Sequence, residues 1–156
     1  MKIALAGLLL TFTLSTQAWA RLGETADQIV DRYGQPLSQL DQKAQGRDIA
    51  MTRLTFQKNG FEILVSLVDG VSDQEAFRKM NGDPLTLAEI RTLLNINAQG
   101  SSWEQPMNSD GEKVWTRDDG TTAEVNGSLI TITSKDMLDK EAAAKKATMA
   151  PSLEGF

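Results

Sequence analysis

The chain has 156 residues, and its 16 basic and 21 acidic side chains give a formal net charge of −5. It contains neither cysteine nor histidine, which excludes disulfide bonds, thiolate metal sites and the side chain that most often acts as a general base near neutral pH. An acidic chain of this kind is not expected to bind nucleic acid or anionic lipid through bulk electrostatics. The length suits one domain, or two small units that share a core.

The first 20 residues have the features of a secretory signal peptide. Lys2 supplies the charged start, residues 3–14 form an apolar run, and Ala18-Trp19-Ala20 is an A-x-A cleavage signal. We expect cleavage after Ala20 and a soluble periplasmic or secreted product with a net charge of −6, because Lys2 is removed. The alternative is an uncleaved membrane anchor. Since the chain has no cysteine, no lipid anchor is expected.

A short amphipathic helix is predicted at residues 25–33. Thr25 and Gln28 form a T-x-x-Q capping box, and Gly34 supplies the left-handed residue that ends the helix. Four apolar residues recur at intervals of three and four and make one face: Ala26, Ile29, Val30 and Tyr33. A helix of two turns is not stable alone, so it must pack on another element.

Three strands of an antiparallel meander are predicted after this helix, at residues 50–58, 61–68 and 71–79. The turns between them are Asn59-Gly60 and Asp69-Gly70, whose residues tolerate positive φ. The middle strand is apolar on one face and half apolar on the other, which fits a sheet with a helix on one side.

The same order of elements is predicted again. Thr86 and Glu89 repeat the capping box, and three more strands are expected at residues 113–117, 121–125 and 128–134. We therefore predict an α+β fold made of two αβββ halves, at about 23–80 and 83–134, with one short helix per three strands and the helices on one sheet face. The alternative is an ordinary α+β domain that uses a helix and a meander twice without common ancestry.

The remaining segments are predicted to be irregular. Residues 38–47 form a polar connection, and residues 96–112 form a loop rich in Gly, Ser, Asn and Pro. Residues 136–156 contain good helix formers but little apolar surface, so we expect a frayed helix followed by a disordered tail. The organised domain is expected to cover residues 21–135.

The stretch GETADQIVDRYGQP, residues 23–36, resembles the helix signature of exported lipoproteins grouped around SmpA/OmlA, which assist β-barrel assembly. A helix and meander in tandem is similar to the β-lactamase-inhibitor-protein-like fold, to which those lipoproteins are related. The chain also resembles a group of uncharacterised exported bacterial proteins through NGF…V…DG at 59–70 and L-T-x-x-E-I-x-x-L-L-N at 85–95. The resemblance implies a sheet surface that binds another protein; the lipidated cysteine of the lipoproteins has no counterpart here.

No pattern of a catalytic, cofactor or metal site was found in the sequence. Asp69, Asp73 and Glu75 cluster around a hairpin turn. They could form a cation site or an acid/base pair, and the alternative is that they are simply turn residues and exposed strand residues. We therefore predict a non-catalytic exported protein-binding module, an envelope accessory or an inhibitor, whose partner is another envelope or secreted protein. The alternative is a hydrolase that depends on carboxylates alone.

Two aromatic residues are the candidate partner-binding residues. Trp103 lies in a polar loop, where it either anchors a partner or folds back over an edge of the core. Phe77 alternates with Glu75 and Lys79 and is predicted to stand on the open sheet face.

Overall fold

The computed structural model describes residues 21–43, 49–104, 107–109 and 112–149. The predicted signal peptide, residues 1–20, and the end of the predicted tail, residues 150–156, lie outside the described residues. Among the described residues, no helix combines the length and the apolar character needed to cross a membrane.

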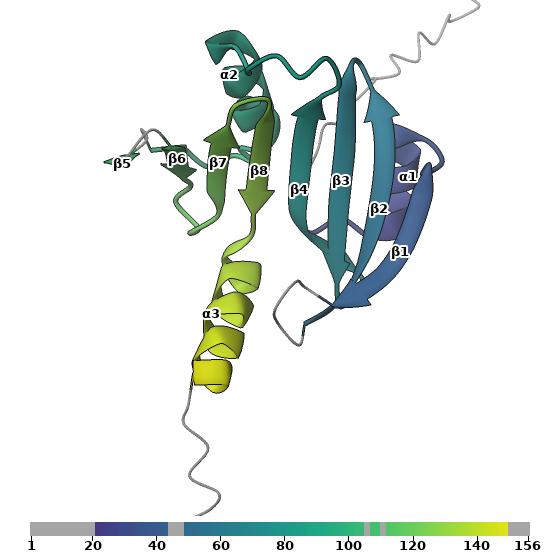
Figure 1. Ribbon diagram of the computed structural model, residues 1–156, viewed down its shortest axis with the longest axis vertical. Coiled ribbons are helices and arrows are strands. Elements are labelled where there is room, and N and C mark those ends of the chain that lie inside the picture. The colour runs from purple at the N-terminus through teal and green to yellow at the C-terminus, as the bar shows by residue number, and fades with distance from the viewer. Residues whose placement is uncertain (1–20, 44–48, 105–106, 110–111, 150–156) are drawn as a thin grey trace, which may run out of the picture.

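The described part of the chain forms eight strands and three helices (Figure 1). In chain order these are α1 Ala26–Tyr33, β1 Ser38–Lys43, β2 Ala50–Lys58, β3 Phe61–Val68, β4 Val71–Lys79, α2 Leu87–Ile96, β5 Met107–Ser109, β6 Glu112–Thr116, β7 Thr122–Asn126, β8 Leu129–Thr133 and α3 Lys135–Met149. The α+β class predicted from the sequence is therefore confirmed.

The strands form one antiparallel sheet in the order β1-β2-β3-β4-β8-β7-β6-β5. Along the chain, α1 is followed by the four strands on one side of the sheet and α2 by the four strands on the other. The last strands of the two sets, β4 and β8, pair at the centre, from Gln74↔Thr133 to Arg78↔Leu129. Two meanders thus share one continuous sheet.

The prediction of three strands per half was wrong at the two outer edges. β1 lies in the segment predicted as a polar connection, and β5 lies in the segment predicted as a loop. β1 pairs with β2 over six residues, although only Gln42 among its side chains is even partly buried. An edge strand of this kind is held by backbone hydrogen bonds and carries no apolar alternation, so the sequence gives no signal for it.

Both predicted helix starts are confirmed. The Thr25 N–H donates to Gln28 Oε1 (2.9 Å), and the Thr86 N–H donates to Glu89 Oε2 (2.7 Å). Gly34 ends α1 with a φ of 88°, and its N–H donates to the Val30 carbonyl (2.8 Å). These contacts satisfy backbone groups that a short helix otherwise leaves unpaired.

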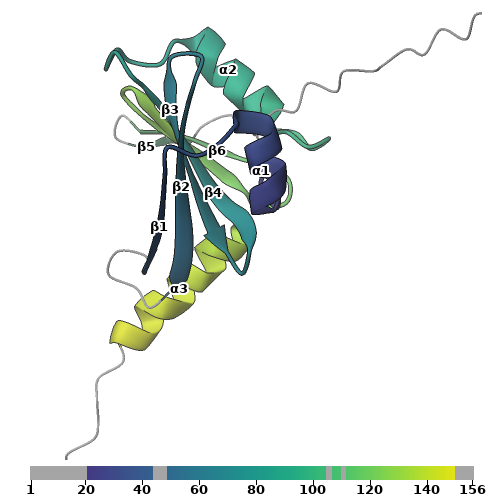
Figure 2. The ribbon, with the colours of Figure 1, turned by 90° about the vertical axis from the view of Figure 1, so that its right-hand side faces the viewer.

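α1 and α2 lie on the same side of the sheet (Figure 2). The main core is between them and the sheet. Its most deeply buried side chains include Ile29, Phe56, Val65, Ile130 and Ile132. On β8 the buried Ile130 and Ile132 alternate with less buried residues, as expected where one sheet face is covered.

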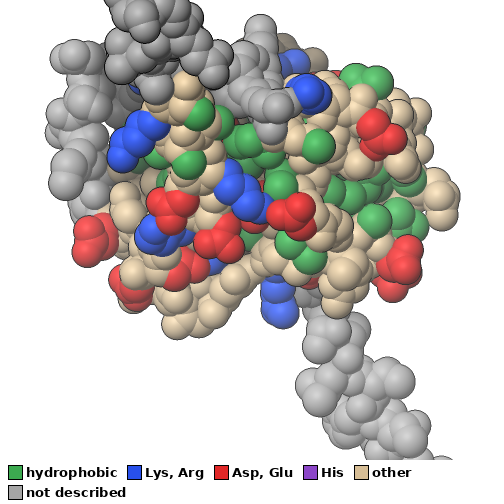
Figure 3. All heavy atoms as spheres, turned by 90° about the horizontal axis from the view of Figure 1, so that it is seen from below, with side chains coloured by type: hydrophobic (Ala, Val, Ile, Leu, Met, Phe, Trp, Pro, Cys, Tyr) green, Lys and Arg blue, Asp and Glu red, His purple; other side chains and the backbone are tan. Residues whose placement is uncertain are grey.

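α3 lies in the segment predicted as a frayed helix, and it packs on a different cluster from α1 and α2. Met137 near its start is buried and packs with Met51 and Val68 in a second, smaller cluster, and the rest of α3 extends from the end of the sheet (Figures 1 and 2). Lys140 Nζ also contacts Asp69 Oδ2 at 2.8 Å. Figure 3 shows acidic and basic side chains interspersed on the surface seen from this end. The helix is thus attached by a few apolar and ionic contacts at its start.

Candidate binding groove

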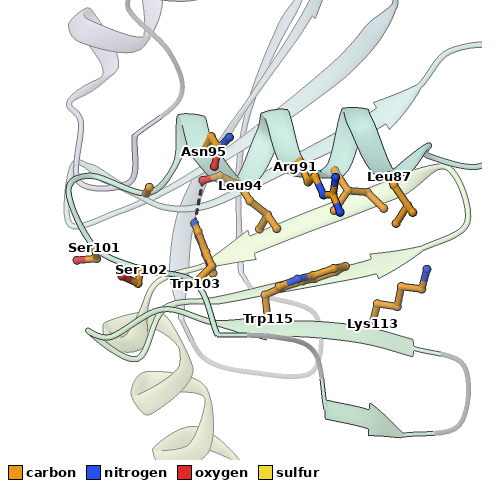
Figure 4. Close-up of a pocket in the computed structure, with 11 residues that line it drawn as sticks. Leu87, Arg91, Leu94, Asn95, Ser101, Ser102, Trp103, Lys113 and Trp115 are labelled. Carbon is orange, nitrogen blue, oxygen red and sulfur yellow. Dashed lines mark hydrogen bonds between the residues drawn. The ribbon is translucent and has the colours of Figure 1, made fainter.

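A groove of about 460 Å³ lies between α2 and β6 (Figure 4). Its size falls in the range of pockets that receive ligands. It is lined by Leu87, Ile90, Arg91, Leu94, Asn95, Ala98, Ser101, Ser102, Trp103, Lys113 and Trp115. The residues come from α2, from the loop that follows it, and from β6, so the fold of the second half assembles this site.

Trp103 is fixed in place by three contacts. Its Nε1–H donates to the Leu94 carbonyl in the last turn of α2 (2.8 Å), and its backbone bridges to that of Arg117. The Arg117 guanidinium lies 5.7 Å from the centre of the ring, which is within the range of a cation–π contact. The Trp103 side chain packs against the core, as one of the two interpretations expected, and it also lines the groove, where the other interpretation places a partner.

Arg117, the residue that lies over the Trp103 ring, is itself buried. Arg117 is held by Asp119, through Nε to Oδ1 (2.9 Å) and Nη2 to Oδ2 (2.5 Å), and it also donates to the Asn97 carbonyl and to Thr121 Oγ1 (3.1 Å). The Arg117 hydrogen bonds hold the pKa of the Asp119 carboxyl well below its usual range. Two contacts therefore hold the indole of Trp103: the hydrogen bond to the Leu94 carbonyl and the guanidinium of Arg117 over the ring.

Trp115 lies on β6 opposite Ala123 of β7, a side chain that is fully buried and small. The indole lies beneath α2, where it packs against the core and lines the groove (Figure 4). The sequence shows both residues, but their pairing across two strands appears only in the structure.

The groove carries two exposed basic side chains, Arg91 from α2 and Lys113 from β6. Neither forms an ion pair or a side-chain hydrogen bond with another described residue. None of the described lining residues is Asp or Glu. The groove therefore has a local positive charge in an acidic chain, and its described residues lack the two facing carboxylates that the alternative hydrolase requires.

The structure places Phe77 elsewhere. It pairs with Ile63 of β3 and Ile130 of β8 on the face that α1 and α2 cover, and it is only 4 % exposed. The expected position on the open sheet face was therefore wrong. Its alternation with Glu75 and Lys79 suggested a polar face, but Glu75 is itself buried with a partner.

The predicted carboxylate cluster is divided between the two sheet faces. The register pairs Ser66 with Gln74 but Leu67 with Ser72, so Asp73 is an extra residue at a β-bulge. Asp73 accepts a hydrogen bond from the Ser134 hydroxyl (2.8 Å) beside α3, while Glu75 faces α1. Among the described residues, no group of three or more Asp or Glu side chains is arranged to hold a metal ion.

Glu75 belongs to a buried polar cluster beneath α1. Its Oε1 lies 3.5 Å from Arg32 Nη1, and its Oε2 accepts from the Tyr33 hydroxyl (3.4 Å). Arg32 also pairs with Glu24. Burial raises the pKa of Glu75 to about 7, although Arg32 and Tyr33 oppose the shift, and burial together with Glu75 raises the pKa of Tyr33. This cluster was not predictable from the sequence, because Arg32 lies outside the apolar stripe of α1 and has the spacing of an exposed polar residue.

Comparisons of the chain with protein-family models, with curated proteins and with solved structures gave no match. The functional proposal therefore rests on the fold and on the groove.

Proposed function

We propose that the protein is a non-catalytic, exported protein-binding module, an envelope accessory or inhibitor, that binds its partner through the groove between α2 and β6. The observation that carries this proposal is the pair of indoles, Trp103 and Trp115, in one groove with Arg91. Trp and Arg are the residue types most enriched among side chains that dominate protein–protein binding energy. Because Trp103 is already fixed by the Leu94 carbonyl, little side-chain entropy is lost when a partner binds.

Export supports a partner in the same compartment. The A-x-A signal before Arg21 predicts release into the periplasm or the medium, where the partner is another envelope or secreted protein. N-terminal sequencing of the secreted or periplasmic chain tests this part of the proposal, with Arg21 expected as the first residue.

The two halves are further proposed to be tandem copies of one helix-and-meander unit, as in the β-lactamase-inhibitor-protein-like fold that the sequence resembles. Each half has a capped helix followed by four strands, and the two last strands pair at the centre of the sheet. Support for this also comes from the matching capping boxes at Thr25 and Thr86. A fold of this kind does not by itself determine a function. The proposed binding function therefore depends on the groove and not on the duplication.

Site-specific photo-crosslinking in the native envelope tests the binding function. A photoreactive residue at Leu87, which lines the groove and is 58 % exposed, is compared with one at Leu40 of β1, which is 57 % exposed and far from the groove in the sheet order. We expect a reproducible protein adduct from position 87 and not from position 40. Equal adducts at both positions, or none at 87, would contradict the proposal.

A further inference from the structure

We propose that the segment bound in this groove is an acidic peptide segment of the partner, in which an apolar side chain lies over Trp115 and carboxylates on either side of it pair with Arg91 and Lys113. This inference rests on the proposed function and specifies the chemistry of the partner.

The charges in the groove argue for carboxylates. Arg91 lies on the α2 wall of the groove and Lys113 on the β6 wall (Figure 4), and no other described residue pairs with either. The nearest acidic side chain of α2, Glu89, is already paired with Lys79 (3.1 Å). Since the described lining residues include two cations and no carboxylate, the local charge of the groove favours an acidic ligand.

The apolar part of the groove argues for one large side chain between those carboxylates. Leu87, Ile90 and Leu94 form the wall on the α2 side, and the indole of Trp115 lies below them (Figure 4). Leu87 is among the few large apolar side chains that remain more than half exposed in the described part of the chain. An aromatic or aliphatic side chain placed here would remove both Leu87 and Trp115 from water.

The far end of the groove argues for a peptide over a fatty acid or another simple amphiphile. Asn95, Ser101 and Ser102 lie at the end away from Lys113 (Figure 4), and their side chains form no hydrogen bond with another described residue. An acyl chain would bury these polar groups without partners, which is costly. The N–H and C=O groups of a peptide backbone can pair with them.

The experiment is a selection from a phage-displayed library of random heptapeptides on the mature chain and on a charge-reversed variant, Arg91→Glu with Lys113→Glu. We expect the unmodified chain to enrich peptides that carry Asp or Glu on both sides of an aromatic or aliphatic residue. The charge-reversed variant should bind those peptides about tenfold more weakly or worse, and should enrich Lys and Arg in their place. Binding of the acidic peptides should also weaken as salt is added.

A second double variant, Arg78→Glu with Lys146→Glu, changes the net charge by the same amount on surfaces away from the groove and should keep the acidic preference. Arg78→Glu also loses the pair with Glu62 (3.4 Å) and places two carboxylates opposite each other, so the second variant should unfold at a somewhat lower temperature. Circular dichroism checks that both variants are folded at the temperature of the selection. The inference is overturned if the unmodified chain enriches neutral or basic peptides, if charge reversal leaves the binding of the acidic peptides unchanged, or if sodium octanoate displaces them from the groove.

These outcomes separate the inference from the proposed function. A partner crosslinked from position 87 together with no acidic preference in the selection would leave the binding function standing and reject the acidic segment. Absence of both the crosslink and any enriched peptide would reject the two proposals together.

Discussion

The two halves of the sheet use the same elements but leave different spaces beneath their helices. Under α1, Tyr33 packs against Phe56 with ring centres 5.3 Å apart, and Phe56 pairs with Ile63 across the sheet. In the α2 half, Trp115 of β6 has only Ala123 as its partner on β7. Large side chains on adjacent strands close the first space, whereas a large side chain next to a small one leaves the second open.

The lengths of the strands also differ between the closed half and the open half. β2 and β3 have nine and eight residues, but β6 and β7 have five each. The carbonyl groups at the helix ends also find different partners, since Lys58 Nζ donates to the Arg32 carbonyl (2.6 Å) and Trp103 donates to the Leu94 carbonyl. The α1 half thus has a closed core, whereas the α2 half has an open groove.

The largest effect is expected from opening the closed half. Arg32→Met removes the cation that faces Glu75 and Glu24, and it leaves two carboxylates near or within the core. We expect the free energy of unfolding to fall by about 3–5 kcal/mol, because breaking a buried pair leaves an uncompensated charge. Urea unfolding at pH 8 measures this change.

The matched control for that variant is Arg91→Met, which removes an exposed guanidinium in the other half and should change the stability by less than about 0.5 kcal/mol. Since Arg32 lowers the pKa of Glu75, its loss should raise that pKa further. The Arg32→Met defect should therefore be smaller at pH 5 than at pH 8, and a defect that does not depend on pH would contradict this account.

The closed half should also make the stability depend on pH. The pKa of Glu75 is about 7 in the folded chain, against 4.5 for the ordinary side chain. Because the pKa of Glu75 is higher in the folded chain, its protonation stabilises the fold. This stabilisation is complete below pH 4.5 and is lost as the pH rises through 7. We expect Glu75 to cost up to about 3 kcal/mol of stability across this interval.

Glu75→Gln tests this dependence, because glutamine has a similar shape and does not titrate. Unfolding free energies measured from pH 4 to pH 8 should fall less steeply in the variant than in the unmodified chain. Glu62→Gln, on the other sheet face and paired with the exposed Arg78, serves as the control and should leave the slope unchanged. Identical slopes in all three proteins would show that Glu75 does not titrate in this range.

A smaller and nearly equal effect is expected from removing the helix caps of the two halves. Thr86→Ala removes a hydroxyl that accepts from the Glu89 N–H (3.2 Å), and Thr25→Ala removes a hydroxyl that donates to Gln28 Oε1 (3.3 Å), so each should cost up to about 1 kcal/mol in urea unfolding. Only Thr86→Ala should also weaken partner binding, because α2 forms one wall of the groove. Weaker binding in the Thr25→Ala variant would show that the closed half contributes to the site.

The sequence predicted those features that depend on neighbouring residues. The capping boxes were predictable because their partners are three residues apart. The hairpin turns were predictable because Asn59 and Asp69, which have φ of 52° and 54° in the structure, tolerate positive φ ahead of a glycine. The order of α1, α2 and the six inner strands followed from these signals together with the apolar alternation of the strands.

The remaining features depend on pairing between distant residues. The β-bulge at Asp73 is defined by the register with β3, and it changes the sheet face to which a carboxylate points. The groove depends on Ala123 being next to Trp115, and on a loop tryptophan reaching the end of α2. Trp103 could be named as a candidate because a large aromatic in a polar loop is unusual, but no local pattern indicates Arg91 or Lys113.

The smallest effect on stability should accompany one of the largest effects on binding. Leu87→Ser removes an apolar side chain that is 58 % exposed at the groove, so the free energy of unfolding should change by less than about 0.5 kcal/mol. Binding of the selected peptides, measured by fluorescence anisotropy, should weaken by about tenfold, since the apolar contact with the ligand is lost. Leu40→Ser removes a side chain of similar exposure from the edge of the closed half and should change neither quantity. If Leu87→Ser and Leu40→Ser bind the selected peptides equally well, the space beneath α2 is not the binding site, and in this respect the two halves do not differ.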